Sequence, residues 1–317
     1  MEHLPYNDYG RAMRKLFGGR VQKLAIDAGL GCPNRDGTIG YGGCTFCLGE
    51  AFSPSYCREH PSIHSQIDAA LQFHAQRGRR ADFHLAYFQS GTNTHASLDI
   101  LERLYNEAIK HPAIAGIIIG TRPDCINSET LQLLHHISHG KYVAIEYGIE
   151  STFDHTLQHV NRGHNFAAAT HAVEQTKALG IAVGAHFILG LPNETRDDIF
   201  ENIHHINALE LDFIKFHQLQ IYTNTVMAKE WEAHPERFLF SQNTNTEDYI
   251  NIIVDIIRRL RADTAIERFA SQAPRHLVMH SPLNGIRLDE LRNRIVARLH
   301  SLQAKQGDYQ SLHLSKK

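Results

Sequence analysis

Residues 23–47 read KLAIDAGLGCPNRDGTIGYGGCTFC, a short apolar stretch followed by a loop that holds three of the five cysteines of the chain. The stretch Lys23–Asp27 has the length and composition of a buried β-strand. Cys44 and Cys47 form a Cys-x-x-Cys pair, and eleven residues separate Cys32 from Cys44. Thiolates are ligands for zinc, copper(I) and iron–sulfur clusters. The segment therefore predicts a metal-binding loop directly after a strand.

Two kinds of metal centre fit this cysteine pattern. Three thiolates on a four-iron cluster leave one iron without a protein ligand, and a small molecule could chelate it. A structural zinc site needs a fourth ligand, for which Cys57, His60 and His64 are close enough in sequence. A disulfide framework is disfavoured, because five cysteines are odd in number and sparse for 317 residues. Cys57 and Cys125 are expected to be free thiols.

The composition is that of an ordinary globular chain. A hydrophobic content of 42% in 317 residues is enough for the core of one large or two modest domains. The longest apolar stretches, such as Ile117–Ile119, are far shorter than the roughly 18 residues of a membrane span. We therefore expect a cytoplasmic protein without a membrane partner.

The net charge of −2 gives no overall basic signature for nucleic acid, so any RNA contact must be local. Three basic clusters are candidates for such a contact. They are Arg11, Arg14, Lys15 and Arg20; Arg77, Arg79 and Arg80; and Arg258, Arg259 and Arg261.

Candidate strands and helices alternate along the first 225 residues. The expected strands are Lys23–Asp27, Phe83–Gln89, Ile117–Gly120, Tyr142–Tyr147, Ile181–Ile188 and Phe213–Ile221. The expected helices between them include Ser97–Lys110, Ser128–His136 and Ala167–Leu179. Six β-α repeats favour a parallel sheet with helices outside it, either an open doubly wound sheet or a partial barrel.

Glycine-containing and polar segments follow each of the six expected strands. In parallel sheets, ligands bind at the carboxyl ends of the strands. We therefore expect these segments to meet at one functional edge. They are the cysteine loop, Ser90–Asn93, Thr121–Asp124, Gly148–Ser151, Gly190–Thr195 and Tyr222–Thr223.

Cys-Pro followed by Cys-x-Phe-Cys, after a first strand, resembles the cluster loop of radical S-adenosylmethionine (SAM) enzymes. The common family spacing is Cys-x3-Cys-x2-Cys, and the longer first gap here resembles the elongator-like branch. With Asp36-Gly37-Thr38 and the segment Gln89–Thr94, the chain is most similar to the small elongator-like proteins of the YhcC/YtqA type. The resemblance implies an α/β fold, a partial (β/α)6 TIM-like barrel of radical SAM type with a helical C-terminal extension.

The resemblance also implies the cofactors and their ligands. A [4Fe-4S] cluster is expected on Cys32, Cys44 and Cys47, with SAM as the second cofactor. Glu150 resembles the acidic residue that reaches the SAM ribose or amino group, and Arg162 resembles the elongator-branch arginine at the SAM carboxylate.

Two further segments are expected to bind SAM by the same resemblance. Ser90-Gly91-Thr92 takes the place of the family's Gly-Gly-Glu segment at the SAM amino group, although it lacks the carboxylate. Leu191, in Gly190-Leu191-Pro192, resembles the turn that shapes the adenine pocket. Without a ligand, the same residues are also consistent with ordinary strand-to-helix turns.

The activity implied is that of a radical SAM enzyme, in which a reduced cluster cleaves SAM to methionine and a 5′-deoxyadenosyl radical. A flavodoxin or ferredoxin-type electron donor is the expected partner. Gram-positive relatives of this type are linked to the tRNA wobble uridine, which suggests tRNA modification. A metabolite or protein substrate stays open, and so does a zinc-stabilised RNA-binding protein without catalysis.

No catalytic residue is named from the sequence. Five side chains at or near strand ends are expected on the substrate side, namely Arg122, Asp124, Glu146, Tyr147 and Tyr222. His186 and His217 lie inside apolar strands and are expected to be ordinary core residues.

The C-terminal part has a helical character. Thr244-x-x-Glu247 is a capping-box pattern followed by an apolar stripe, and Leu288–Gln306 indicates a second helix. We expect a radical SAM core with its lead-in at residues 1–225 and a helical extension packed on it at residues 226–317. The extension has no cysteine pair that would hold an auxiliary cluster.

Overall fold

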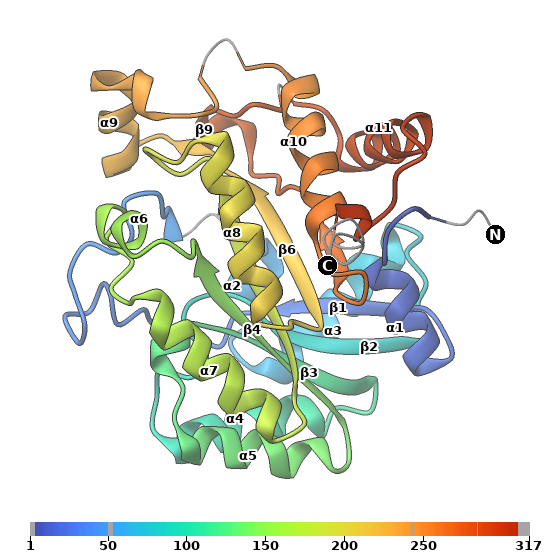
Figure 1. The fold of residues 1–317 in the computed structure, drawn as a ribbon. Helices are drawn as coiled ribbons and strands as arrows, with labels where there is room; N and C mark the ends of the chain where they lie inside the picture. The colour runs from blue at the N-terminus through green and yellow to red at the C-terminus, as the bar shows by residue number, and fades with distance from the viewer. Residues whose placement is uncertain (1–3, 50–52, 242–243, 284, 310–317) are drawn as a thin grey trace.

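The computed structural model describes residues 4–49, 53–241, 244–283 and 285–309. At its centre is a sheet of seven parallel strands that lie side by side in chain order. The sheet curls into a partial barrel with helices around its outer face (Figure 1). The strands are β1 Val21–Ile26, β2 Phe83–Phe88, β3 Ile114–Thr121, β4 Tyr142–Glu150, β5 Ala182–Leu189, β6 Phe213–Gln218 and β8 Ala265–Arg268. The expected partial barrel is confirmed.

Helices connect successive strands and cover the outside of the barrel. They are α2 (Ser55–Glu59), α3 (Ile63–Gln76), α4 (Leu98–Ile109), α5 (Ser128–Ser138), α6 (Asp154–His159), α7 (Phe166–Ala178) and α8 (Arg196–Ala208). A short 3-10 helix, Pro123–Cys125, follows β3. Among the described residues, no helix combines the length and apolar content that crossing a membrane requires.

Side chains alternate between the two faces of each strand. On β2, Ala86 and Phe88 belong to the outer core under the helices, whereas Leu85 and Tyr87 belong to a smaller core inside the barrel. Successive side chains of a strand point to opposite faces, so one apolar strand serves both layers. This explains why the strands have nearly continuous apolar sequences.

Residues after 225 complete the barrel. The strand β8 pairs with β6, and Asp8 bridges to Ile266 on its other side. Helix α1 (Tyr9–Phe17) then places Tyr9 and Met13 in the inner core. The sequence did not predict β8, because four residues give too short a periodic pattern. The division at residue 225 stays a prediction.

The C-terminal helices differ in detail from expectation. Helix α10 (Thr246–Arg259) has its capping box at Asn245 and Asp248, one residue later than the predicted pair. Helix α11 (Leu288–Ser301) ends before the expected Gln306, whose backbone N–H bonds the carbonyl of Pro5. The remaining elements are α9 (Val226–Ala233), β7 (Ile221–Tyr222), β9 (Val278–His280), and the 3-10 helices Pro235–Arg237 and Arg275–Leu277.

Four buried charges occupy the inside of the barrel. Glu146, on β4, accepts hydrogen bonds from Lys23 of β1 at 2.7 Å and from Lys215 of β6 at 2.5 Å. Glu267, on β8, pairs with both lysines. The side chain of Glu146 is 0% exposed and that of Lys215 is 2% exposed. Two carboxylates and two ammonium groups balance, which is the condition under which buried charges are tolerated.

Removing one member of this network leaves a buried charge uncompensated. We expect Lys215→Met to lower the free energy of unfolding by about 3–5 kcal/mol. The double variant Lys215→Met/Glu267→Gln restores charge balance and should lose less than the single variant. Urea unfolding at pH 7 measures both values. A single variant as stable as the parent protein would contradict this account of the network.

Candidate functional site

The cysteine loop is a compact turn anchored at both ends. The backbone N–H groups of Arg35 and Asp36 bond the carbonyl of Cys32, and that of Cys47 bonds the carbonyl of Cys44. Arg35 also donates from Nη2 to the carbonyl of Cys47 at 2.8 Å. These bonds fold the loop that carries the three cysteines at the carboxyl end of β1.

Two asparagines that the sequence analysis did not single out join this loop to the segment after α6. Asn34 donates from Nδ2 to the carbonyl of Asn161 at 2.6 Å, and Asn161 donates to the carbonyl of Gly43 at 2.8 Å. Asn161 has a φ of 52°, a left-handed conformation that asparagine tolerates better than most residues. In the sequence, the position of Asn161 directly before Arg162 was the feature that could have indicated its part in the site.

The sulfur of Cys44 receives two N–H donors. Arg162 Nη1 lies 3.6 Å from it, and Asn34 Nδ2 lies 3.8 Å from it. Burial would lower the pKa of Arg162, but the electrostatic effects of Cys44 and Glu150 outweigh burial and raise it above its ordinary value. The guanidinium therefore stays charged beside the sulfur of Cys44.

The cysteine sulfurs are not gathered as a single zinc ion would gather them. Tetrahedral thiolate ligands of zinc are about 3.8 Å apart, from a Zn–S distance of about 2.3 Å. In the described part of the chain, only His64, Asp68 and His111 form a set of three ligand atoms all within 4.8 Å of one another. Cys57 donates to the carbonyl of Ala25, and burial raises the pKa of its thiol to about 11. This geometry does not favour the zinc alternative.

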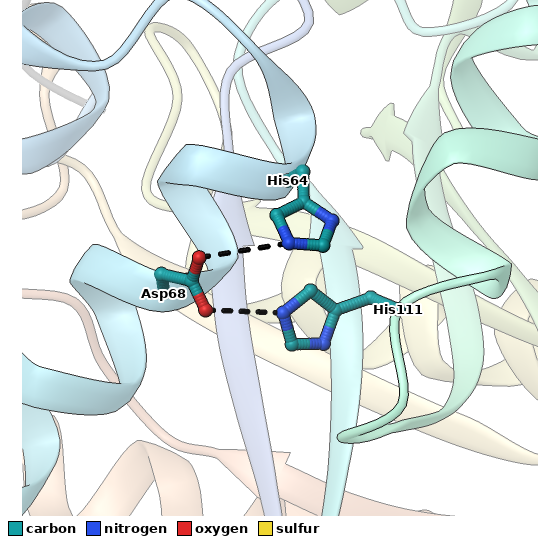
Figure 2. A group of neighbouring side chains, drawn as sticks. All are labelled: His64, Asp68 and His111. Carbon is teal, nitrogen blue, oxygen red and sulfur yellow. Dashed lines mark hydrogen bonds and ion pairs between the residues drawn. The ribbon is translucent and has the colours of Figure 1, made fainter.

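His64 and Asp68 are exposed on α3, and His111, in the turn after α4, is buried beside them (Figure 2). Nδ1 of His111 accepts the backbone N–H of Ala113, so its proton is on Nε2, which donates to Asp68 at 3.1 Å. For a metal to bind at Nε2, the imidazole proton would have to move to Nδ1. There it would face the N–H of Ala113, so two donors would meet without an acceptor. We interpret the group as a clamp between elements, and His64 is not a fourth ligand for the cysteines.

The segment Ser90-Gly91-Thr92 lies directly against the cysteine loop. The N–H of Thr92 bonds the carbonyl of Gly31 at 3.0 Å. Gly91 has a φ of 77°, and a β-carbon there would lie 2.2 Å from the carbonyl oxygen of Leu30. Only glycine fits this contact. The hydroxyl of Ser90 is buried and has no hydrogen-bond partner among the described residues.

Glu150 and Arg162 meet at the end of β4. Arg162 Nη2 donates to the carbonyl of Gly148 at 2.5 Å and lies 3.9 Å from Glu150 Oε1. Glu150 has a φ of 74°, which is strained for a residue other than glycine and is often found at functional sites. Nε of Arg162 is buried without a partner among the described residues. One guanidinium thus joins the cysteine loop to the end of β4.

Leu191 lies in an apolar cluster beside the cysteine loop. It is fully buried, together with Val160 and Leu219, and Phe46 of the Cys-x-Phe-Cys segment packs against the cluster. The backbone of Thr45 bonds Val160 on one side and Met227 of α9 on the other. The structure therefore brings all the predicted site loops to the same edge of the barrel.

Glu194, which belongs to the predicted segment Gly190–Thr195 but was given no role of its own, connects two of these loops. Its Oε1 accepts the hydroxyl of Ser151 at 2.6 Å, which ties the segment after β5 to the segment after β4. Burial raises the pKa of Glu194 to about 7. No sequence pattern indicates the hydrogen bond between Ser151 and Glu194, because the two residues are 43 positions apart.

The expected substrate-side residues have different locations. Arg122 forms a bidentate pair with Asp124 at the end of β3, and Tyr222 is buried with its hydroxyl on Gln220. Glu146 belongs to the barrel interior. The expectation for Tyr147 was wrong, because its hydroxyl bonds Thr176 of α7 on the outer face. The alternation of β4 places neighbouring residues on opposite faces.

Several buried polar atoms at this edge lack partners among the described residues, namely Ser90 Oγ, Arg122 Nη1 and Arg162 Nε. Buried polar groups are normally hydrogen-bonded, so their grouping beside three thiols fits a polar ligand next to a metal centre. The residues present therefore fit an iron–sulfur cluster with SAM.

Comparison with known proteins agrees with this geometry. The Radical SAM superfamily model matches residues 29–206, and the Radical_SAM C-terminal domain model matches residues 211–300. Protein YhcC of Escherichia coli is 35% identical over 270 residues, 85% of this chain and 84% of the relative. YtqA of Bacillus subtilis is 30% identical over 309 residues, 96% of this chain and 92% of the relative.

A solved structure shows the same fold. The archaeal Methanocaldococcus infernus Elp3 with an N-terminal deletion is 15% identical, with a TM-score of 0.66. The match covers 90% of this chain but only 64% of that one. The chain belongs to the radical SAM superfamily, as a YhcC/YtqA-type protein of its elongator-like branch.

Proposed function

We propose that this protein holds a [4Fe-4S] cluster through Cys32, Cys44 and Cys47, binds SAM beside it, and modifies tRNA. The observation that carries the cofactor part is Arg162, which reaches the sulfur of Cys44 and lies 3.9 Å from Glu150. When bound, the cluster and SAM supply reductive cleavage of a carbon–sulfur bond and a carbon radical that abstracts hydrogen.

Arg162 is suited to orient SAM. Its Nε is buried without a partner among the described residues, and its charge is retained next to Cys44. A carboxylate accepts donors of a guanidinium fork in a fixed geometry, which lysine does not reproduce. We propose that Arg162 binds the SAM carboxylate and that Glu150 accepts the ribose hydroxyls or the amino group.

The other loops complete the proposed SAM site. Gly91 allows close approach of the backbone, and the free hydroxyl of Ser90 lies beside it, next to Thr92, at the place proposed for the SAM amino group. Leu191 lies in an apolar cluster that excludes water and suits an adenine ring. A flavodoxin or ferredoxin-type protein is the proposed electron donor.

A basic surface supports an RNA substrate. The backbone N–H of Asp82 bonds the carbonyl of Arg20, and the backbone N–H of Arg20 bonds the carboxylate of Asp82, so the segments that follow α1 and α3 lie next to each other. Within the described ranges, Arg14, Lys15, Arg79 and Arg80 are exposed and make no ion pair. The third cluster is different, because Arg258, Arg259 and Arg261 are paired with carboxylates. Unpaired cations on adjoining elements suit a phosphate backbone.

This basic surface lies at the amino ends of β1 and β2, at the edge of the barrel opposite the cysteine loop. A substrate that reaches both places must extend along the whole barrel. A macromolecule such as tRNA can do so, whereas a small metabolite cannot. A substrate bound at both places would therefore be a macromolecule and not a metabolite.

Alanine at any of the three ligand cysteines should remove the cluster. We expect Cys32→Ala, Cys44→Ala and Cys47→Ala to bind little iron after anaerobic reconstitution and to make no 5′-deoxyadenosine from SAM and dithionite. Cys57→Ala is the matched control, because Cys57 bonds a backbone carbonyl away from the loop. It should keep both properties. Loss of the cluster in Cys57→Ala would refute the ligand assignment.

Arg79→Gln/Arg80→Gln should weaken binding of total bacterial tRNA and flatten its salt dependence. Each lost phosphate contact reduces the slope of log K against log salt concentration by about 0.7–0.9. Arg287→Gln is the control, since Arg287 is exposed but paired with Asp289. Fluorescence anisotropy at several salt concentrations measures the slope. Equal slopes for the double variant and the control would argue against tRNA on this surface.

A further inference from the structure

Two histidines stand inside the barrel just below the cofactor loops. His186 of β5 and His217 of β6 have ring centroids 5.3 Å apart. His186 is opposite Gly148 in the register of β4 and β5, two residues before Glu150. Its side chain is 22% exposed, while that of its partner Glu146 is 0% exposed. His186 therefore lies at the boundary between the buried charge network and the open end of the barrel.

Glu146 fixes the tautomer of His186. Nε2 of His186 lies 2.9 Å from Oε2 of Glu146, which also accepts a hydrogen bond from Lys215, while Oε1 accepts one from Lys23. Burial would raise the pKa of Glu146, but the two lysines hold it well below its usual range. An ionised carboxylate only accepts hydrogen bonds, so Nε2 carries the proton of the imidazole.

Nδ1 of His186 is then a bare acceptor. In the described part of the chain, Nδ1 has no hydrogen-bond partner. It is also not one of the buried unpartnered atoms, so it is open to a ligand. Burial and the nearby Lys215 lower the pKa of His186, so the ring is neutral near pH 7. The neighbouring His217 is also neutral, because burial holds its pKa well below the usual value.

The charges around His186 determine which kind of hydrogen-bond donor is favoured at Nδ1. Glu146 and Glu267 are balanced by Lys23 and Lys215, and Glu150, which also acts on His186, lies 3.9 Å from the guanidinium of Arg162. Arg268, whose side chain is 40% exposed, adds a positive charge near His217. A neutral N–H or O–H group, such as the imide of a pyrimidine ring, therefore fits better than an ammonium group.

We infer that His186 contacts the substrate as a hydrogen-bond acceptor through Nδ1, with Glu146 as the positioning residue that sets its tautomer. The inference rests on the proposed function, because it places the reacting part of the substrate between His186 and the SAM loops. It assigns the substrate a neutral hydrogen-bond donor close to the carbon that loses hydrogen. The sequence alone gave both histidines only a core role.

Two substitutions test the roles of the two ring nitrogens of His186 separately. The amide of asparagine takes the position of Nδ1 and retains an acceptor there, whereas that of glutamine takes the position of Nε2 and retains the contact with Glu146. We expect His186→Gln to lower tRNA-dependent formation of 5′-deoxyadenosine about tenfold, mainly through KM, since one hydrogen bond is lost. His186→Asn should lose less. His64→Gln, on the outer surface, is the control.

If His186→Gln turns over tRNA as well as His64→Gln does, the inference is overturned while the proposed function stands. If the parent protein makes no 5′-deoxyadenosine, the proposed function fails, and the substrate contact that rests on it fails too. A second measurement tests the tautomer of His186 on which the inference depends. That measurement is the ¹⁵N NMR spectrum of the histidine rings without cofactors, with His186 assigned from His186→Gln. A neutral ring protonated at Nε2 at pH 7 supports the inference. Protonation at Nδ1, or at both nitrogens, overturns it.

Discussion

The contact of Arg162 with the sulfur of Cys44 is the interaction on which the cofactor site depends. The guanidinium is buried, bonds the carbonyl of Gly148 and lies near Glu150. A buried cation needs polar or anionic neighbours, and here the sulfur of Cys44 and the carboxylate of Glu150 lie beside it on two different loops. Without Arg162, the cysteine loop and the end of β4 would share no hydrogen-bonding side chain in the described part of the chain, and the proposed SAM site would lose its centre.

The barrel interior supports this edge through a second set of charges. Glu146 joins β1, β4 and β6, and Glu267 adds β8, so four strands share one network. This network lies below the proposed cofactor loops, and His186, which contacts Glu146, is partly exposed there. The same network that holds the strands together thus determines the proton position of a residue that we propose contacts the substrate.

The sequence predicted the six strands and the edge where the loops meet, because apolar runs and glycine-rich segments are local signals. It missed β8, which has four residues, and it placed Tyr147 on the wrong face. The residues that bind the loops together, Asn34 and Glu194, were also missed. Their partners are more than forty positions away, so the contacts exist only in the folded chain. Long-range pairing of this kind has no local pattern.

The proposed function requires an iron–sulfur cluster with one iron that SAM can bind. Electron paramagnetic resonance of the anaerobically reconstituted, dithionite-reduced protein, recorded with and without SAM, tests this most directly. We expect about four irons per chain by the cluster stoichiometry, a signal of a reduced cluster, and a changed signal when SAM is added. A protein that binds one zinc and shows no signal, or a cluster whose signal SAM does not alter, would contradict the account.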